Sequence, residues 1–217
     1  MKQFDLLVFD WDGTLMDSTG AIISSLQAAC RDLGLPVPSD EAASHIIGLG
    51  LNEALAELLP GLAPSEYGQL VERYRHHFLS QDHEIPLFDG VFDAIQALSE
   101  MGFMLAVATG KSRRGLDRAF AYTGLGKYFH ASRCADEGFS KPHPGMLLEL
   151  MGEMGTMPDK TLMIGDTTHD LQMAINAKVP GLGAAYGAHP KENLMALAPV
   201  ACLDNFSDLN QWLKMYA

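Results

Sequence analysis

Short apolar runs alternate with helical patterns along most of this chain, and this alternation constrains the fold more than any other feature. The runs lack the strict polar alternation of a half-exposed strand, so each fits a strand that is buried on both faces. The runs lie at residues 6–9, 104–108, 129–132, 162–164, 181–185 and 200–203, and helical patterns lie at 91–101, 114–122, 144–154 and 171–177. Strand and helix in alternation predict an α/β fold with a doubly wound parallel sheet.

The segment from residue 18 to residue 86 breaks this alternation. It contains helical patterns at 21–33, 39–47, 51–59 and 65–79, separated by Gly or Pro, and no convincing strand. We therefore expect an all-helical domain, residues 17–86, inserted after the first strand. The α/β core would then consist of residues 1–16 and 87–217.

Composition and charge restrict the partners of such a protein. Hydrophobic residues make up 47% of the 217, which is enough to bury a sizeable core. The formal charge of -12 argues against binding to nucleic acid or to an anionic membrane surface. No stretch approaches the roughly 20 apolar residues that span a bilayer, and the three cysteines include no CxxC pair that would indicate zinc. We expect a cytoplasmic protein, a monomer or a homodimer, without nucleic-acid or membrane partners.

Polar residues gather where the predicted strands end. Ligands of open α/β sheets bind beyond the carboxyl ends of the strands, so these residues are candidates for a functional site. In chain order they are Asp10, Asp12, Gly13 and Thr14; Thr109, Gly110 and Lys111; Ser140 and Lys141; and the run Gly165 to Asp170. Acids, hydroxyls and a lysine are therefore predicted to meet at one edge of the sheet.

This set of side chains suits phosphoryl transfer. Mg2+ prefers oxygen ligands and leaves positions for water and substrate phosphate, and Asp10 and Asp166 are candidate ligands. A phosphate dianion would be repelled by two carboxylates, so the metal and Lys141 would have to offset that charge. The expected cofactor is Mg2+, and the expected partner is a small phosphorylated metabolite.

Four motifs resemble those of the haloacid dehalogenase-type phosphohydrolases. They are DWDGT at 10–14, Thr109, Lys141 in KPHP, and GDTTHD at 165–170, and they occur in that order along nearly the whole chain. The resemblance implies a Rossmann-like core with a helical cap. Within the superfamily, the chain is most similar to the phosphoglycolate phosphatase group.

The resemblance implies roles for the acids. Asp10 would attack phosphorus and form an aspartyl-phosphate, which splits one difficult displacement into two easier ones. Asp12 would protonate the leaving alcohol and later deprotonate the hydrolytic water, and its backbone carbonyl would bind the metal. Asp166 would ligate Mg2+, and Asp170 would ligate it or orient its waters.

The resemblance also implies a phosphate-binding set. Thr109 and Gly110 would donate to the phosphoryl group, Lys141 would stabilise its charge, and Gly13 would permit a tight turn with backbone amides facing it. Each motif alone has a structural interpretation as well. Thr109 suits a turn or helix cap, residues 166–170 suit the cap of the next helix, and Lys141 suits a solvated surface lysine. Their joint occurrence after the appropriate strands favours catalysis.

The inserted segment bears on the substrate. Residues 17–86 carry a net charge of -7, ten acids less three arginines, and no lysine. The resembled phosphonoacetaldehyde hydrolases need a cap lysine, which argues against their chemistry here. In the loop 47–52, Asn52 is a candidate for hydrogen bonding to a leaving group, although a helix stop and restart explains the loop equally well. No clear cap cation awaits a substrate carboxylate, which puts 2-phosphoglycolate itself in question.

Three other functions stay open at this point. Pyrophosphate hydrolysis uses the same centre, and a β-phosphoglucomutase-like phosphotransferase is disfavoured only by the missing cap lysine. A receiver-type signalling domain also combines acids, a hydroxyl and a lysine around Mg2+. Such a domain is much shorter and carries its phosphorylated Asp on a middle strand.

Overall fold

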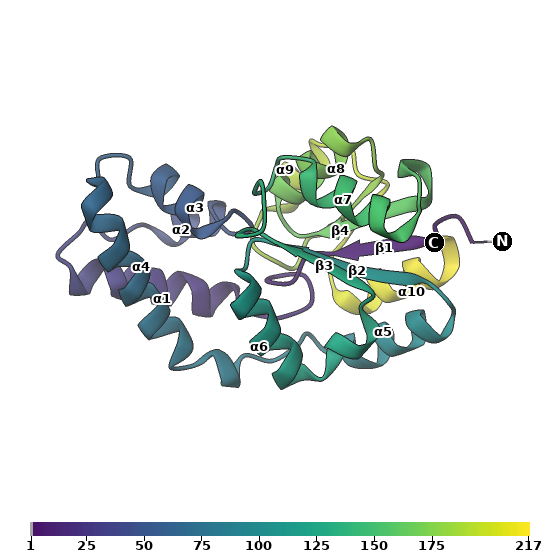
Figure 1. Cartoon of the computed structure of the whole chain (residues 1–217), viewed down its shortest axis with the longest axis horizontal. Coiled ribbons are helices and arrows are strands. Elements are labelled where there is room, and N and C mark those ends of the chain that lie inside the picture. Colours follow the sequence, from purple (N-terminus) through teal and green to yellow (C-terminus); the bar gives the residue numbers. More distant parts are fainter. Residues whose placement is uncertain (1) are drawn as a thin grey trace.

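The computed structural model describes residues 2–217 and contains a six-stranded sheet in which every paired strand runs parallel (Figure 1). The strands are β1 (Leu6–Phe9), β2 (Met104–Thr109), β3 (Ala131–Cys134), β4 (Thr161–Gly165), β5 (Gly181–Ala184) and β6 (Ala201–Leu203). Their order is β3-β2-β1-β4-β5-β6, so the sheet is wound in both directions from β1. The predicted doubly wound α/β fold is confirmed.

Helices cover both faces of the sheet. They are α5 (Val91–Glu100), α6 (Arg113–Thr123), α7 (Gly145–Met154), α8 (Thr168–Ala177), α9 (Lys191–Met195) and α10 (Phe206–Tyr216). Successive strand side chains point to opposite faces. Leu7 and Phe9 join the core shared with α5, α6 and α10, whereas Leu6 and Val8 join the core shared with α7 and α8 (Figure 1). Burial on both faces explains why the strands read as continuous apolar runs.

The segment between β1 and α5 is helical and buries a cluster of its own. Its elements are α1 (Thr19–Asp32), α2 (Asp40–His45), α3 (Leu51–Leu58), α4 (Pro64–Leu79) and the short 3-10 helix η1 (Asp82–Glu84). Leu26, Leu55 and Leu70 are at the centre of that cluster. The two ends of the segment lie side by side, because the Asp17 N–H donates to the Pro86 carbonyl at 3.0 Å. In Figure 1 these helices extend beyond the carboxyl ends of the strands.

Local signals place the helix ends close to their predicted positions. The Ser39 side chain accepts a hydrogen bond from the Ala42 N–H at the start of α2, and Gly124 and Gly155 adopt left-handed conformations at the ends of α6 and α7. Two further 3-10 helices, η2 (Leu125–Tyr128) and η3 (Pro158–Lys160), precede β3 and β4. Within the described part of the chain, no helix combines the length and apolar character needed to cross a membrane.

The third strand departs from its prediction. The apolar signal indicated 129–132, but the strand runs two residues later, from Ala131 to Cys134. Phe129 instead packs its ring against Trp11 and Phe120, in the core beneath β1. The apolar character of Phe129 therefore reflects aromatic packing rather than a place in the sheet.

Candidate active site

The carboxyl ends of β1, β2 and β4 meet at one edge of the sheet and present polar side chains there. Asp10 directly follows β1 and its N–H donates to the Ile164 carbonyl of β4 at 2.8 Å. Thr109 is the last residue of β2, and Asp166 directly follows β4. All three side chains are buried, although each is polar. Neighbouring parallel strands therefore bring together residues that are more than 150 positions apart in the chain.

Three aspartates form a buried acidic cluster at this edge. Asp10, Asp166 and Asp170 each offer a carboxylate oxygen within 4.8 Å of the others. Lys141 is 2% exposed, and its Nζ lies 2.8 Å from Asp10 Oδ1 and 2.6 Å from Asp170 Oδ1. The interpretation of Lys141 as a solvated surface lysine is therefore wrong. One ammonium against three carboxyls leaves an excess of potential negative charge, which favours a cation.

Burial governs the ionisation of this cluster. It raises the pKa of Asp10 well above the ordinary value, and the adjacent Lys141 ammonium offsets only part of that effect. It raises the pKa of Asp166 to about 7, with a further contribution from the Asp170 carboxyl. Burial lowers the pKa of Lys141, but the Asp10 and Asp170 carboxylates outweigh it and hold that pKa above its usual value. Lys141 is therefore charged at any pH at which these acids are ionised.

Asp166 is held by hydrogen bonds to both of its oxygens. The Thr14 hydroxyl donates to Oδ1 and the Ala188 N–H donates to Oδ2, both at 2.7 Å. Two glycines make room for it, because a Cβ atom at Gly13 or Gly187 would overlap the Asp166 carboxyl. Gly13 also has a φ of +79°, which side chains rarely adopt. Gly13 of the DWDGT motif therefore leaves the space that the carboxyl group of Asp166, at the end of β4, occupies.

Asp170 both caps a helix and joins the acidic cluster. Its Oδ2 accepts from the Thr167 hydroxyl at 2.7 Å and from the Thr167 N–H at 3.1 Å, while its own N–H donates to Thr167 Oγ1 at the start of α8. Its Oδ1 faces Lys141 instead. One oxygen of the Asp170 carboxyl group therefore caps α8, and the other belongs to the acidic cluster.

Asp12 lies outside that cluster and pairs with a second lysine. Lys111 Nζ is 2.8 Å from Asp12 Oδ1 and 2.9 Å from Oδ2, and the Ser18 hydroxyl donates to Oδ1 at 2.7 Å. The side chains of Asp12 and Lys111 are each 11% exposed. The sequence placed Lys111 at this edge, directly after Thr109 and Gly110, but indicated no role for it and no pairing with Asp12.

The turn after β2 packs closely under the helical segment. The Thr109 hydroxyl is buried and accepts from the Lys111 N–H at 3.1 Å. A Cβ atom at Gly110 would overlap the Gly48 and Leu49 carbonyls, so only glycine permits this approach. Nearby, the Gly50 N–H donates to the Ser140 hydroxyl at 2.6 Å. Asn52 is exposed in the first turn of α3, and within residues 2–217 its side chain makes no hydrogen bond to the acidic cluster.

Two histidines of the core bind the end of α2. His169 Nε2 and His189 Nε2 lie 2.8 and 3.1 Å from the His45 carbonyl oxygen, which the helix itself leaves unpaired. The Thr168 N–H donates to His189 Nδ1 at 3.0 Å, so the proton of this ring is on Nε2, from which it donates to His45. The Ser44 hydroxyl donates to the Ala188 carbonyl at 2.6 Å. These contacts fix the turn that leads into the loop over Gly110.

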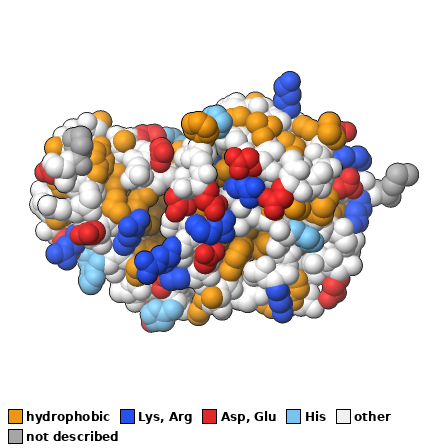
Figure 2. Space-filling model, viewed as in Figure 1, with side chains coloured by type: hydrophobic (Ala, Val, Ile, Leu, Met, Phe, Trp, Pro, Cys, Tyr) orange, Lys and Arg blue, Asp and Glu red, His pale blue; other side chains and the backbone are white. Residues whose placement is uncertain are grey.

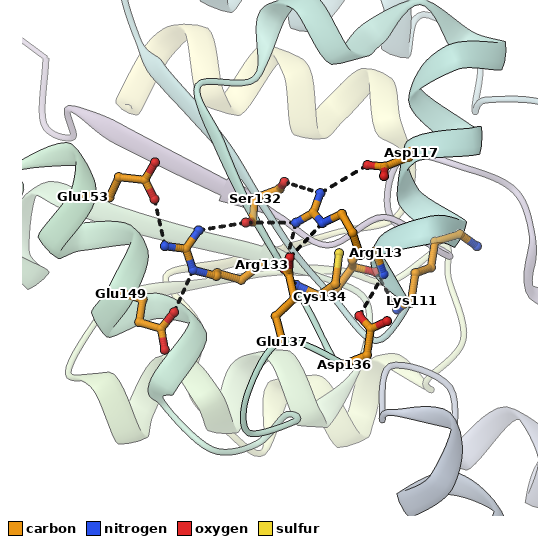
Figure 3. Close-up of polar contacts among 11 residues, drawn as sticks. Lys111, Arg113, Asp117, Ser132, Arg133, Cys134, Asp136, Glu137, Glu149 and Glu153 are labelled. Carbon is orange, nitrogen blue, oxygen red and sulfur yellow. Dashed lines mark hydrogen bonds and ion pairs between the residues drawn. The ribbon is translucent and has the colours of Figure 1, made fainter.

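Charged side chains connect the loops after β2 and β3. Figure 3 shows Arg113 between Glu137 and Ser132, and it shows Arg133 of β3 bound by Glu149 and Glu153 of α7. The Asp136 carboxylate accepts from the Arg113 N–H at 2.8 Å, and the Ala135 N–H donates to the Lys111 carbonyl at 3.1 Å. The backbone that carries Lys111 is thus attached to the loop that leads to Lys141.

The surface around these loops carries both signs of charge. On the face drawn in Figure 2, Lys and Arg side chains alternate with Asp and Glu side chains across the middle of the molecule. The ion pairs of Arg113 with Glu137 and of Arg133 with Glu149 have N–O distances of 2.8 and 2.7 Å. Charges of both signs are therefore mixed on this face.

Comparison with known proteins gives a consistent result. Residues 7–184 match the family profile described as haloacid dehalogenase-like hydrolase. The probable phosphatase IndB of Dickeya dadantii is 35% identical over 210 residues, which cover 94% of this chain and 91% of the relative. A phosphoglycolate phosphatase of Agrobacterium fabrum is 31% identical over 211 residues, which cover 94% and 90%. A predicted phosphoglycolate phosphatase from Haemophilus somnus has a similar crystal structure, with a TM-score of 0.84, 25% identity, and coverage of 97% of this chain and 98% of that one.

Proposed function

This chain belongs to the haloacid dehalogenase-like hydrolase family and is a phosphatase similar to phosphoglycolate phosphatases, and we propose that it hydrolyses a small phosphate monoester with Mg2+ through an aspartyl-phosphate. The observation that carries the proposal is the buried cluster of Asp10, Asp166 and Asp170 with Lys141 as its cation. A structural core does not require three buried acids at one strand edge, because each costs free energy to bury.

The donor set fits a hard divalent cation. Both oxygens of Asp10 are buried, and the Lys141 ammonium lies 2.8 Å from Oδ1. We assign the metal to the Asp10 and Asp166 carboxylates and the Asp12 carbonyl, with Asp170 as a direct ligand or as a partner of metal-bound water. When bound, Mg2+ would supply charge that lets a phosphate dianion approach these acids.

Asp10 is the proposed nucleophile. One of its oxygens forms a bond to phosphorus while the bond between phosphorus and the leaving oxygen breaks, and a water molecule later cleaves the aspartyl-phosphate. Lys141 lies against Asp10 and favours its ionised form, which is the nucleophilic form. Thr109, Gly110 and the turn at Gly13 are the proposed donors to the transferring phosphoryl oxygens.

Asp12 is the proposed acid and base. It would donate a proton to the leaving oxygen in the first step and accept one from water in the second. Its carboxyl group contacts neither Lys141 nor the acidic cluster but is held by Ser18 and Lys111. The two acids of the motif therefore pair with different lysines.

Residues 17–86 are the proposed cap. Its loop lies over Gly110 through the Gly48 and Leu49 carbonyls, so a closed cap would exclude bulk water from the transferring phosphoryl group. Asn52 follows this loop and would reach the leaving group only after the cap moves, because its side chain is exposed in the present arrangement. Pyrophosphate hydrolysis or phosphotransfer at the same centre would use the same residues.

The proposal is tested with purified wild-type protein, Asp10→Asn and the control Asp17→Asn. Asp17 belongs to the same stretch of sequence but is exposed. Each protein is assayed with p-nitrophenyl phosphate and a panel of metabolite phosphates, with Mg2+ and with a chelator. We expect Mg2+-dependent turnover by the wild type and by Asp17→Asn, and a loss of at least about 10⁴-fold in Asp10→Asn. Full activity of Asp10→Asn would show that the assigned nucleophile is wrong.

A further inference from the structure

A cavity of about 300 Å³ lies between the end of the helical segment and α6. Its walls come from the linkers at Met16 and Ile85, from Phe78 of α4, from η1, and from the face of α6 toward the linkers. The lining residues that matter for binding are Phe78, Asp82, Lys111 and Arg118. Most of this wall is apolar, so its few charged groups determine what can bind there.

Lys111 connects this cavity to Asp12. Its ammonium group is bound by both Asp12 oxygens and lies 4.9 Å from the centre of the Phe78 ring. Within residues 2–217, Asp12 is the only carboxylate within 4 Å of this ammonium. The other cavity cation, Arg118, is already paired with Asp82 at 3.2 Å. Lys111 is thus the cation at this wall whose partner is a residue of the proposed reaction.

The proposed role of Asp12 makes demands on that ion pair. When Asp12 turns an oxygen to the leaving group, Lys111 loses part of its carboxylate partner while it stays almost buried. An ammonium in such a place needs a replacement, because a buried charge without a partner is costly. Hydrogen-bonded atoms lie about 2.8 Å apart. If one Asp12 oxygen contacts both the Lys111 ammonium and the leaving oxygen, these two groups lie within roughly 6 Å of each other. An anionic group close to the leaving oxygen would meet that need.

We propose that Lys111 is a specificity residue that binds an oxyanion on the leaving group of the substrate, with the rest of that group in the cavity beside α6. This inference rests on the proposed function. The oxyanion is a carboxylate or a second phosphate, on the atom that carries the leaving oxygen or on the next one. A neutral leaving group of the same size leaves Lys111 without a partner and is a poorer substrate for that reason.

The location of Lys111 in the core bears on the lack of lysine in the helical segment. Residues 17–86 contain no lysine, and their arginines are Arg31, Arg73 and Arg75, none of which lines the cavity. The cation for the leaving group comes instead from the core, two residues after the last residue of β2. The absence of a cap lysine therefore does not exclude an anionic leaving group.

The test compares three substrates that share a transferable phosphoryl group. They are 2-phosphoglycolate, inorganic pyrophosphate and ethyl phosphate, whose leaving groups carry a carboxylate, a phosphate and no charge. For the wild type, we expect kcat/KM for at least one anionic substrate to exceed that for ethyl phosphate by about 100-fold, and which of the two it is identifies the oxyanion. Lys111→Met should reduce that ratio by about tenfold or more, and Lys111→Arg should restore most of it.

The ratio of kcat/KM values is independent of the fraction of correctly folded protein. Lys127→Met removes an exposed lysine from η2 and should leave the ratio within about twofold of the wild type. An unchanged ratio in Lys111→Met, with turnover still abolished by Asp10→Asn, would overturn the role of Lys111 and leave the proposed function intact. Absence of Mg2+-dependent turnover of every substrate by the wild type would overturn both.

Discussion

The substitution Lys141→Met tests whether the acidic cluster is balanced by a single buried cation. Lys141 is fully enclosed, with its Nζ 2.8 Å from Asp10 and 2.6 Å from Asp170. Methionine has a similar length and preserves most of the packing, so the main change is the loss of one positive charge. Three acids would then share the site without a cation.

The expected loss of stability is large and depends on pH. Removing one member of a buried ion pair costs about 3–5 kcal/mol, and a protein of this size shifts its Tm by roughly 2–4 °C per kcal/mol. The Tm should therefore fall by on the order of 10 °C at pH 8, where burial of ionised carboxyls is most costly. The folded-state pKa of Asp10 is already raised and would rise further without Lys141, so at pH 5 protonated acids should make the loss smaller.

The measurement is thermal unfolding of metal-free wild type and Lys141→Met at pH 5 and pH 8, followed by circular dichroism. Saturating Mg2+ should recover part of the loss at pH 8 if the three acids bind the cation together. Lys191→Met is the matched control, because Lys191 lies 2.6 Å from Asp204 but both side chains are exposed. We expect little change in that variant at either pH.

Two results would refute this reasoning. An equal loss of Tm at pH 5 and pH 8 would mean that Lys141 stabilises the fold by packing rather than by charge. An unchanged Tm at pH 8 would mean that solvent or proton uptake already compensates the acids, so the cluster would not need a cation. The second result would also weaken the assignment of a metal to Asp10 and Asp166.

Three further predictions concern the same edge of the sheet. In the metal-free wild type, folding raises the pKa of Asp166 from 3.8 to about 7. The free energy of unfolding measured in urea should therefore fall as the pH rises from about 4 to about 7, by at most on the order of 4 kcal/mol. Excess Mg2+ should flatten this pH dependence. Gly187→Ala displaces the Asp166 carboxyl and should weaken Mg2+ binding by about 10–100-fold in calorimetry, whereas Gly20→Ala, with open space around it, should not. His189→Phe removes a donor to the His45 carbonyl, so hydrogen exchange should become faster in the loop that follows α2. Unchanged exchange would contradict the idea that this hydrogen bond holds the loop.

Most of the fold followed from one-dimensional patterns because both faces of the sheet are buried. The strands β1, β2, β4 and β5 lie within a residue or two of their predicted positions, because their apolar runs are buried in the sheet itself. The predicted position of the edge strand β3 was wrong by two residues, because Phe129 packs in the aromatic cluster around Trp11 instead of pairing in the sheet. Aromatic residues that flank an edge strand give the same local signal as the strand itself.

The candidate site was predictable only where strand ends determine it. Asp10, Thr109 and Asp166 meet because parallel neighbours end at one edge, and this follows from the order of elements alone. The pair of Asp12 and Lys111 joins residues 99 positions apart through the direction of two side chains, which no local pattern specifies. The two hydrogen bonds to the His45 carbonyl likewise depend on how the helical segment sits on the core.

The two acids of DWDGT can lie close together because each has its own lysine. Asp10 pairs with Lys141, from the loop before α7, and Asp12 pairs with Lys111, from the turn after β2. A single shared cation would couple the two carboxyls, so any group that displaced it from one acid would change the charge of the other. Separate cations remove that coupling. We therefore expect a change at Lys141 to alter the proposed metal binding at Asp10, and a change at Lys111 to alter the proposed choice of leaving group at Asp12, with little effect of either change on the other.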